Sequence, residues 1–344
     1  MTADDYRERG LFEALVADGR PPLTWTALAL IFSGGFALFV SAAGQFLPHD
    51  IAFLGVSAEE LRAVAGGRLV AFMFHDRVAF GGSLLAIGFL YLWLVEFPLG
   101  RREAWAWWTL ALSGAVGFGS FLTYLGYGYL DSWHGAGTLA LLPLFALGMA
   151  RSYRSLGRPR GLLESLRRPE APRWSSTAGL GRWLLIATGA GMVAGGGTIM
   201  VVGMTRVFVP QDLAFIGLAP SDLEAIHPWL IPLIAHDRAG FGGGICSCGL
   251  LVLLCAWRAR PERSLFQAFG LAGAAGFGTA IGIHFAIGYI DLVHLLPAYL
   301  GALIYLAALS LAVWGRRTAP APGTVAARPP ASAGPANRPR EPST

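Results

Sequence analysis

The residues best suited to chemistry are two copies of a His-Asp-Arg sequence, at 75–77 and 236–238, both inside long apolar segments. Each half of the chain also has an aspartate followed three residues later by a histidine, in Asp131–His134 and Asp291–His294. Ionisable side chains are costly inside apolar helices, so they usually face the interior of a helix bundle. The sequence therefore predicts two interior histidines in each half.

Two imidazoles that face each other across a helix bundle favour a bis-histidine haem, because haem iron takes axial ligands from opposite sides. The expected pairs are His75 with His134 and His236 with His294. Arg77 and Arg238 lie two residues after the first histidine of each pair, and we expect them to contact haem propionates. We expect haem b, at one or two sites per chain, with these four histidines as iron ligands.

Other interpretations of the same side chains stay open. Histidine and aspartate also join helices by hydrogen bonds alone, and together they suit a zinc or iron site without haem. Asp131 and Asp291 fit an N-cap as well as an orienting contact with the histidine that follows. Asp76 and Asp237 are the candidates for a catalytic acid. The remaining histidines do not recur in both halves, so we interpret them as structural: His49, His227 and His284.

These residues recur because the chain contains an internal repeat. Four motifs appear in the same order in both halves, at an offset between 159 and 162 residues. The matches are DIAFLG/DLAFIG from 50 and 212, HDRVAFGG/HDRAGFGG from 75 and 236, GAVGFGS/GAAGFGT from 114 and 273, and GYLDSWH/GYIDLVH from 128 and 288. Four ordered matches indicate a duplicated unit. The glycine-rich pair predicts close packing of helices and not a phosphate loop, because it lies inside apolar segments.

The elements that must position these residues are predicted membrane helices. The chain has 344 residues, of which 54% are hydrophobic and 14% charged, which excludes a soluble globular class. Eight stretches are long enough to span a bilayer, which takes about 20 apolar residues. They are 23–46, 68–97, 104–129, 131–150, 181–205, 229–257, 265–289 and 291–314. Within each half, Ser57–Glu60 and Ser221–Glu224 fit the capping box of a short surface helix.

Arginine positions predict the orientation of these spans. All 26 basic residues are arginines, and 21 of them fall on one side if the N-terminus is cytoplasmic. This bias assigns both termini to the cytoplasm and explains the net charge of +5 without a nucleic-acid partner. The expected organisation is a cytoplasmic segment (1–22), a four-helix repeat (23–150), a cytoplasmic linker (151–180), a second four-helix repeat (181–314) and a disordered cytoplasmic tail (315–344).

This pattern resembles the haem A synthase family over residues 23–314. The family is similar in its eight spans, its two four-helix halves, its cytoplasmic termini and its paired histidines near the outer face. The resemblance implies haem ligation by His75, His134, His236 and His294. Two features differ, because Phe72 stands where the family has a glutamate, and residues 47–67 contain no cysteine. The resemblance therefore implies haem binding but not oxidation of a haem methyl group.

The expected fold is an all-α integral membrane protein of eight spans, built as two tandem four-helix bundles around a pseudo-two-fold axis along the membrane normal. The leading functional hypothesis is a haem-binding protein of the cell membrane, acting in electron transfer or as a haem-modifying oxidoreductase. Its partners would be the lipid bilayer and a quinone or membrane redox protein. The alternatives are a proton-coupled transporter and a membrane scaffold without chemistry.

Overall fold

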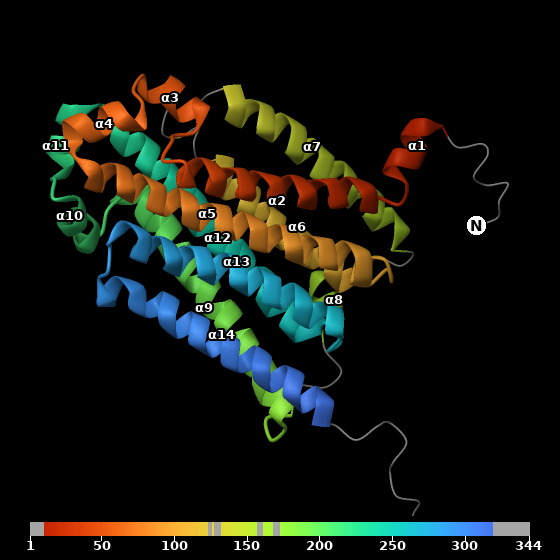
Figure 1. The fold of residues 1–344 in the computed structure, drawn as a ribbon. Helices are drawn as coiled ribbons and strands as arrows, with labels where there is room; N and C mark the ends of the chain where they lie inside the picture. Colours follow the sequence, from red (N-terminus) through yellow and green to blue (C-terminus); the bar gives the residue numbers. More distant parts are fainter. Residues whose placement is uncertain (1–9, 123–125, 127–131, 157–160, 168–172, 319–344) are drawn as a thin grey trace, which may run out of the picture.

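The computed structural model describes residues 10–122, 126, 132–156, 161–167 and 173–318, and the regular elements of this part of the chain are helices (Figure 1). Eight long helices lie close to the predicted spans. They are α2 (Arg20–Ala42), α5 (Gly67–Leu94) with its π-helical extension η2 (Val95–Leu99), α6 (Ala104–Phe121), α7 (Ser132–Ser155), α9 (Thr177–Thr205), α12 (Leu230–Arg258), α13 (Arg263–Ile287) and α14 (Leu292–Thr318).

Six of the described helices are long and apolar enough to cross a membrane: α2, α5 with η2, α9, α12, α13 and α14. The chain is therefore an all-α protein with the character of a multi-pass membrane protein. The predicted third and fourth spans correspond to α6 and α7, which form as helices but fall outside this group over their described residues.

Short helices gather at one end of the bundle, which we call the capped end (Figure 1). They are α3 (Pro48–Leu54), α4 (Ala58–Ala65), α10 (Pro210–Ile216) and α11 (Pro220–Ile226). Two further short helices lie toward the opposite end, α1 (Leu11–Val16) and α8 (Leu162–Leu166). The sequence predicted one capping helix per half, whereas the structure has two. The additional pair, α3 and α10, carries the repeated DIAFLG/DLAFIG motif.

The predicted capping box forms in the first half only. Ser57 Oγ accepts a hydrogen bond from the Glu60 N–H, and a Glu60 carboxylate oxygen accepts one from the Ser57 N–H. Hydrogen bonds from Ser57 lower the pKa of the exposed Glu60 carboxyl. In the second half the predicted box is wrong by two residues: α11 begins at Pro220, and the Asp222 carboxylate accepts a hydrogen bond from the Ala219 N–H. Proline has no N–H and fits the first helical position, so it moves the start of the helix.

The two repeats pack across each other. α5 packs against α2 of its own repeat and against α13 of the other, and α12 likewise packs against α9 and α6. Glycines mark both crossings, because a Cβ on Gly82 would lie 1.7 Å from Thr279 Oγ1 and one on Gly243 would lie 1.8 Å from Ser120 Oγ. The third helix of each repeat therefore packs on the second helix of the other, and the repeats do not form two separate bundles.

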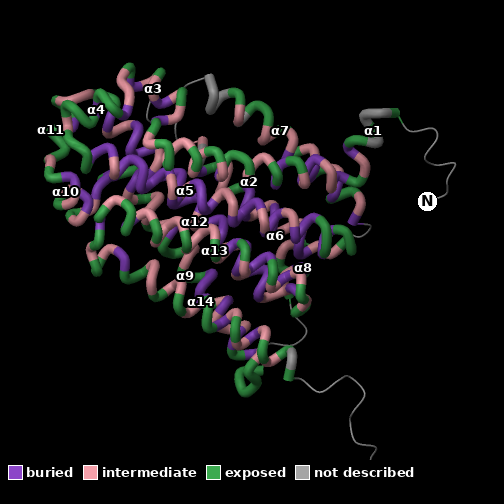
Figure 2. Tube along the Cα trace, in the orientation of Figure 1, coloured by how far each residue is buried: buried purple, intermediate pink, exposed green. Residues whose placement is uncertain are grey.

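The core runs along α5 and α12, which lie at the centre of the bundle and contact each other (Figure 2). In their most apolar stretches 67% and 83% of the residues are buried, against at most 22% in the other four candidate spans. Both copies of the His-Asp-Arg sequence lie in these two helices. Their position in the core explains why polar side chains there need internal partners.

Candidate metal centre

Three histidines from three helices meet near the capped end. His75 lies in α5, His284 near the end of α13 and His294 near the start of α14. One ring nitrogen from each lies within 4.8 Å of the others. His75 and His284 are only 3% and 5% exposed, so their ring nitrogens face one another and not water. The cluster joins one histidine of the first repeat to two of the second.

Hydrogen bonds fix the orientation of His75 and His284. The Nδ1 of His75 lies 3.0 Å from Oδ1 of Asp76, and the Nδ1 of His284 lies 2.6 Å from the carbonyl oxygen of Ala280. A carboxylate or carbonyl oxygen can only accept a hydrogen bond, so each Nδ1 carries the hydrogen. In a neutral ring the other nitrogen, Nε2, is then a lone-pair acceptor.

The two Nε2 atoms face each other at 3.0 Å. Two lone pairs repel at this distance unless a proton or a metal ion is shared between them. A tetrahedral metal about 2.0–2.1 Å from each imidazole nitrogen places those nitrogens about 3.3 Å apart. The Nε2–Nε2 distance is therefore close to that of two neighbouring ligands of one metal ion. Carboxylate and carbonyl groups behind the ring are also the usual outer partners of metal-binding histidines.

The third histidine is held by the connection between α13 and α14. The Asp291 carboxylate accepts a hydrogen bond of 2.7 Å from the His294 N–H, which is the N-cap role that the sequence left open. The His294 ring stacks on the Tyr289 ring with a centroid distance of 4.7 Å. The Tyr289 ring also stacks on Phe215, with a centroid distance of 4.5 Å. The Tyr289 hydroxyl donates to Asp212 at 2.9 Å, and burial raises the pKa of this phenol, so it stays a donor.

Two arginines link the repeats through a reciprocal set of ion pairs beside the cluster. Arg77 contacts Asp50 of its own repeat at 2.7 Å and Asp237 of the other at 3.1 Å. Arg238 forms the equivalent pairs, with Asp212 of its own repeat and with Asp76 of the other at 3.5 Å. The two arginines therefore make equivalent pairs of contacts, because Asp50 and Asp237 are the repeat counterparts of Asp212 and Asp76.

The ion-pair set carries more negative than positive charge. Four carboxylates surround two guanidinium groups, which leaves two negative charges when all are ionised. Three of these aspartates are at most 1% exposed, namely Asp50, Asp76 and Asp212. Buried net charge is costly unless it is compensated nearby. The three-histidine cluster lies next to this set through the contact of Asp76 with His75.

The structure brings together a different set of residues from the one predicted. His75 and His294 belong to one cluster, although the sequence assigned them to separate pairs, and His236 is not part of this group. The reason is the crossing of the repeats, which packs α5, with His75, against α13 of the other repeat, which carries His284. Asp131 lies outside the described residues, as does the side chain of His134.

The predicted roles of the arginines also differ, because Arg77 and Arg238 bind aspartates and do not lie at an open propionate site. Asp76 orients His75, whereas Asp237 contacts Arg77. Phe72, at the position of the glutamate in the resembling family, packs against the His75 ring with centroids 5.9 Å apart. An apolar ring thus stands where that resemblance would place an acid.

The geometry of the cluster does not fit haem between His75 and His284. Axial ligands lie on opposite sides of the iron, about 4 Å apart for bonds of about 2 Å, with a flat macrocycle between the rings. Here the rings meet edge to face with centroids 4.3 Å apart, and their Nε2 atoms are in direct contact. A single ion matches this spacing and a macrocycle does not.

Sequence reasoning missed His284 because its counterpart in the repeat is a tyrosine, so it was interpreted as structural. Three other contributors lie in repeated motifs, which is a signal that the sequence does carry. Asp50 and Asp212 begin the repeated DIAFLG/DLAFIG motif, and Tyr289 lies in the repeated GYLDSWH/GYIDLVH motif. A polar residue that recurs in both copies of an apolar repeat indicates a shared internal partner, here the arginine of the same repeat.

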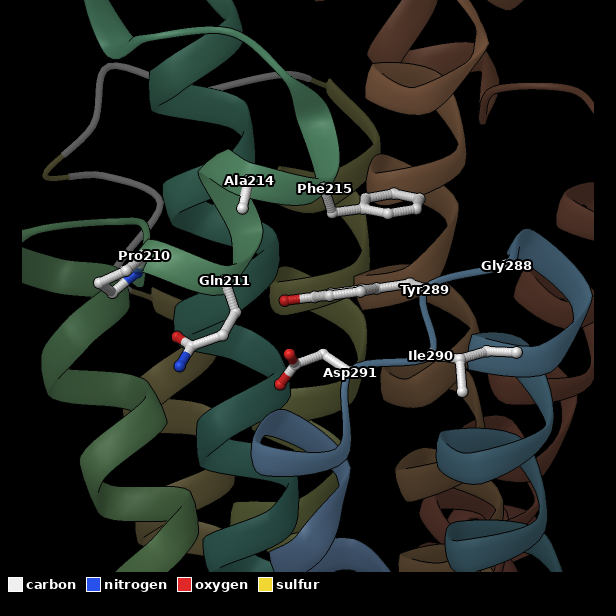
Figure 3. A pocket seen from close by; sticks show the side chains of 8 residues that line it. All are labelled: Pro210, Gln211, Ala214, Phe215, Gly288, Tyr289, Ile290 and Asp291. Atoms are coloured by element: carbon white, nitrogen blue, oxygen red, sulfur yellow. The ribbon is translucent and has the colours of Figure 1, made fainter.

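A pocket of about 450 Å³ opens beside the cluster, and we call it the end pocket. It is formed by residues of α10 and by residues 288–291, which connect α13 to α14 (Figure 3). The side chains of Gln211 and Asp291 face each other across it, and the Tyr289 ring lies between them and Phe215 (Figure 3). The same Tyr289 ring stacks on His294. One side chain thus borders both the pocket and the cluster.

No family model, curated protein or solved structure matches the chain. The assignment of this site therefore depends on the chemistry of its residues.

The cysteines take no part in this site. Cys246, Cys248 and Cys255 are buried free thiols.

Proposed function

We propose that this chain is an integral membrane metalloprotein whose metal centre is formed by His75, His284 and His294. The observation that carries the proposal is the contact of two Nε2 atoms at 3.0 Å, with both Nδ1 atoms donating to oxygen acceptors. A shared cation removes the repulsion between these lone pairs. Three imidazoles suit divalent zinc, iron, nickel or copper.

The charge balance supports a divalent ion. The neighbouring ion-pair set has two more carboxylates than guanidinium groups, and a divalent cation on neutral histidines offsets this surplus. Three protein ligands leave a fourth position for water or a substrate, which is the arrangement of catalytic and not of structural zinc sites. The bound metal would supply Lewis acidity at that position, and Asp76 would hold His75 in the binding orientation.

We place this centre near the outer face of a cell membrane. Eight spans, with both termini cytoplasmic, agree with the arginine distribution and with the eight long helices. Equivalent helices of the two repeats make equivalent contacts, which supports a pseudo-two-fold axis along the membrane normal. In this orientation the capped end, and with it the three histidines, faces away from the cytoplasm.

A shared proton is the second candidate occupant, because it too would separate the two Nε2 lone pairs. Protonation of the pair would favour a proton-coupled transporter, the alternative that the sequence left open. Haem b on the four repeated histidines would require ligand pairs other than the cluster found here. These occupants are distinguishable by metal content and optical spectra.

The test uses the full chain purified in detergent, stripped with a chelator and then loaded with Co²⁺. We expect one Co²⁺ per chain with the visible absorption of a tetrahedral site, and elemental analysis of untreated protein should find a bound transition metal. His284→Gln removes one ligand and should abolish this absorption. His227→Gln is the matched control, because His227 lies outside the cluster.

Retention of the cobalt spectrum in His284→Gln would contradict the proposed ligand set. Failure of the wild-type protein to bind Co²⁺, together with proton release on titration of the pair, would favour the transporter. A haem absorption band in the purified protein that survives His284→Gln would favour the haem hypothesis.

A further inference from the structure

We infer that the end pocket is the access route by which a hydrated divalent cation reaches the three histidines, with Tyr289 as the wall between them. This inference rests on the proposed metal centre. The pocket, of about 450 Å³, is larger than the space of a single water molecule, about 30 Å³, and admits an ion with its water shell.

The lining of the pocket favours a cation. Its charged side chain is the carboxylate of Asp291, the amide of Gln211 is its neighbour across the opening, and among the described residues no arginine or histidine lines it (Figure 3). Oxygen ligands of this kind bind a hydrated metal ion weakly, which suits passage. The surplus of carboxylates in the buried ion-pair set adds an attractive field at this end of the bundle.

A single side chain, that of Tyr289, separates the pocket from the proposed metal ligands. Tyr289 is 3% exposed and stacks on His294, while its hydroxyl is held by Asp212. The centroid of its ring lies 5.4 Å from that of His284 and 5.9 Å from that of His75. Tyr289 is therefore a ring neighbour of all three histidines. Asp291 also borders both sites, because it lines the pocket and accepts a hydrogen bond from the N–H of His294.

The first experiment measures access without any metal. Full-length apo protein is treated with diethyl pyrocarbonate, and carbethoxylation of His284 is followed by mass spectrometry, with His227 as the internal reference. Tyr289→Ala opens the wall and should raise the His284 rate severalfold, whereas Tyr289→Phe keeps the ring and should leave it near the wild-type value. If the alanine variant does not fold, Tyr289→Leu takes its place. Leucine fills more of the space than alanine, so the His284 rate should rise by a smaller factor.

The second experiment blocks the mouth of the pocket in a chain that keeps Tyr289. Gln211→Cys is labelled with a bulky maleimide, which should react at this position alone because the native cysteines are buried. The unlabelled variant is the control. The label should slow both His284 modification and Co²⁺ association severalfold, and leave the cobalt affinity unchanged, since a plug outside the site slows entry and release alike. Asp291→Asn keeps the N-cap and should slow Co²⁺ association, whereas Asp222→Asn on α11 should not.

Unchanged His284 modification after both opening the wall and blocking the mouth would overturn the access route. This outcome is separate from failure of the metal centre, which shows as absent Co²⁺ binding at equilibrium. Changed His284 modification without Co²⁺ binding would leave a route to the histidines but exclude a divalent cation as what travels along it.

Discussion

Asp76→Asn should weaken metal binding far more than the equivalent change Asp237→Asn. Each substitution removes one carboxylate charge from the same ion-pair set, and each leaves one aspartate on its arginine, Asp212 for Arg238 and Asp50 for Arg77. The difference is local, because Asp76 contacts Nδ1 of the ligand His75 at 3.0 Å, whereas Asp237 contacts an arginine. Comparison of these two variants therefore separates the effect of orienting a metal ligand from the effect of losing a charge.

Loss of an outer-shell partner of a metal ligand costs about 10–100-fold in affinity, which is about 1.4–2.7 kcal/mol. We expect Asp76→Asn to fall in this range, since asparagine keeps the shape but its amide no longer attracts the Nδ1 hydrogen as a carboxylate does. Asp237→Asn should weaken binding by less than about tenfold, through charge alone.

The assay is competition for Co²⁺ between the purified variant and a chelator of known affinity, followed through the absorption of the bound cobalt. Thermal unfolding of the apo proteins provides the control for folding, and the two variants should lose similar stability. Equal affinities for Asp76→Asn and Asp237→Asn would refute the role of Asp76 as an orienting residue. A full loss of binding in Asp237→Asn alone would move the centre toward His236.

Arg77→Gln should destabilise the protein by about 3–5 kcal/mol, because it leaves buried Asp50 and partly buried Asp237 without their arginine, and a wild-type unfolding midpoint would contradict the ion-pair assignment. Gly82→Ala should cost about 1–3 kcal/mol through overpacking against α13, whereas Gly278→Ala, with open space around it, should not, and unfolding in denaturant compares the two. Metal affinity should fall as the pH is lowered into the acid range, because protons compete for the histidine nitrogens, and chelator competition across pH measures this; a pH-independent affinity would argue against imidazole ligands.

Local features of the fold followed from the sequence. Hydropathy located the eight long helices to within a few residues over most of their lengths, and the Ser57–Glu60 spacing located the start of α4. These features depend on neighbouring residues alone. The capping of α11 did not follow, because Pro220 moved the start of that helix by changing which N–H groups needed partners.

Only part of the candidate site could be predicted from the sequence. His75 and His294 were predicted because they recur in both repeats, and their polar character is unexpected in apolar helices. His284 was missed, since its counterpart in the repeat is not a histidine. Asp50 and Asp212 recur but were not assigned a partner, because the short helices that carry them were not expected.

The sequence by itself determined that this is a duplicated, apolar, helical chain with ionisable residues at fixed positions in its helices. Only the tertiary structure decided which helices meet. A periodic pattern defines the face that a helix buries, but any helix with a complementary small-residue face can cover it. Here Gly82 and Gly243 let α5 and α12 approach the third helix of the opposite repeat, and that crossing places His75 against His284 and His294.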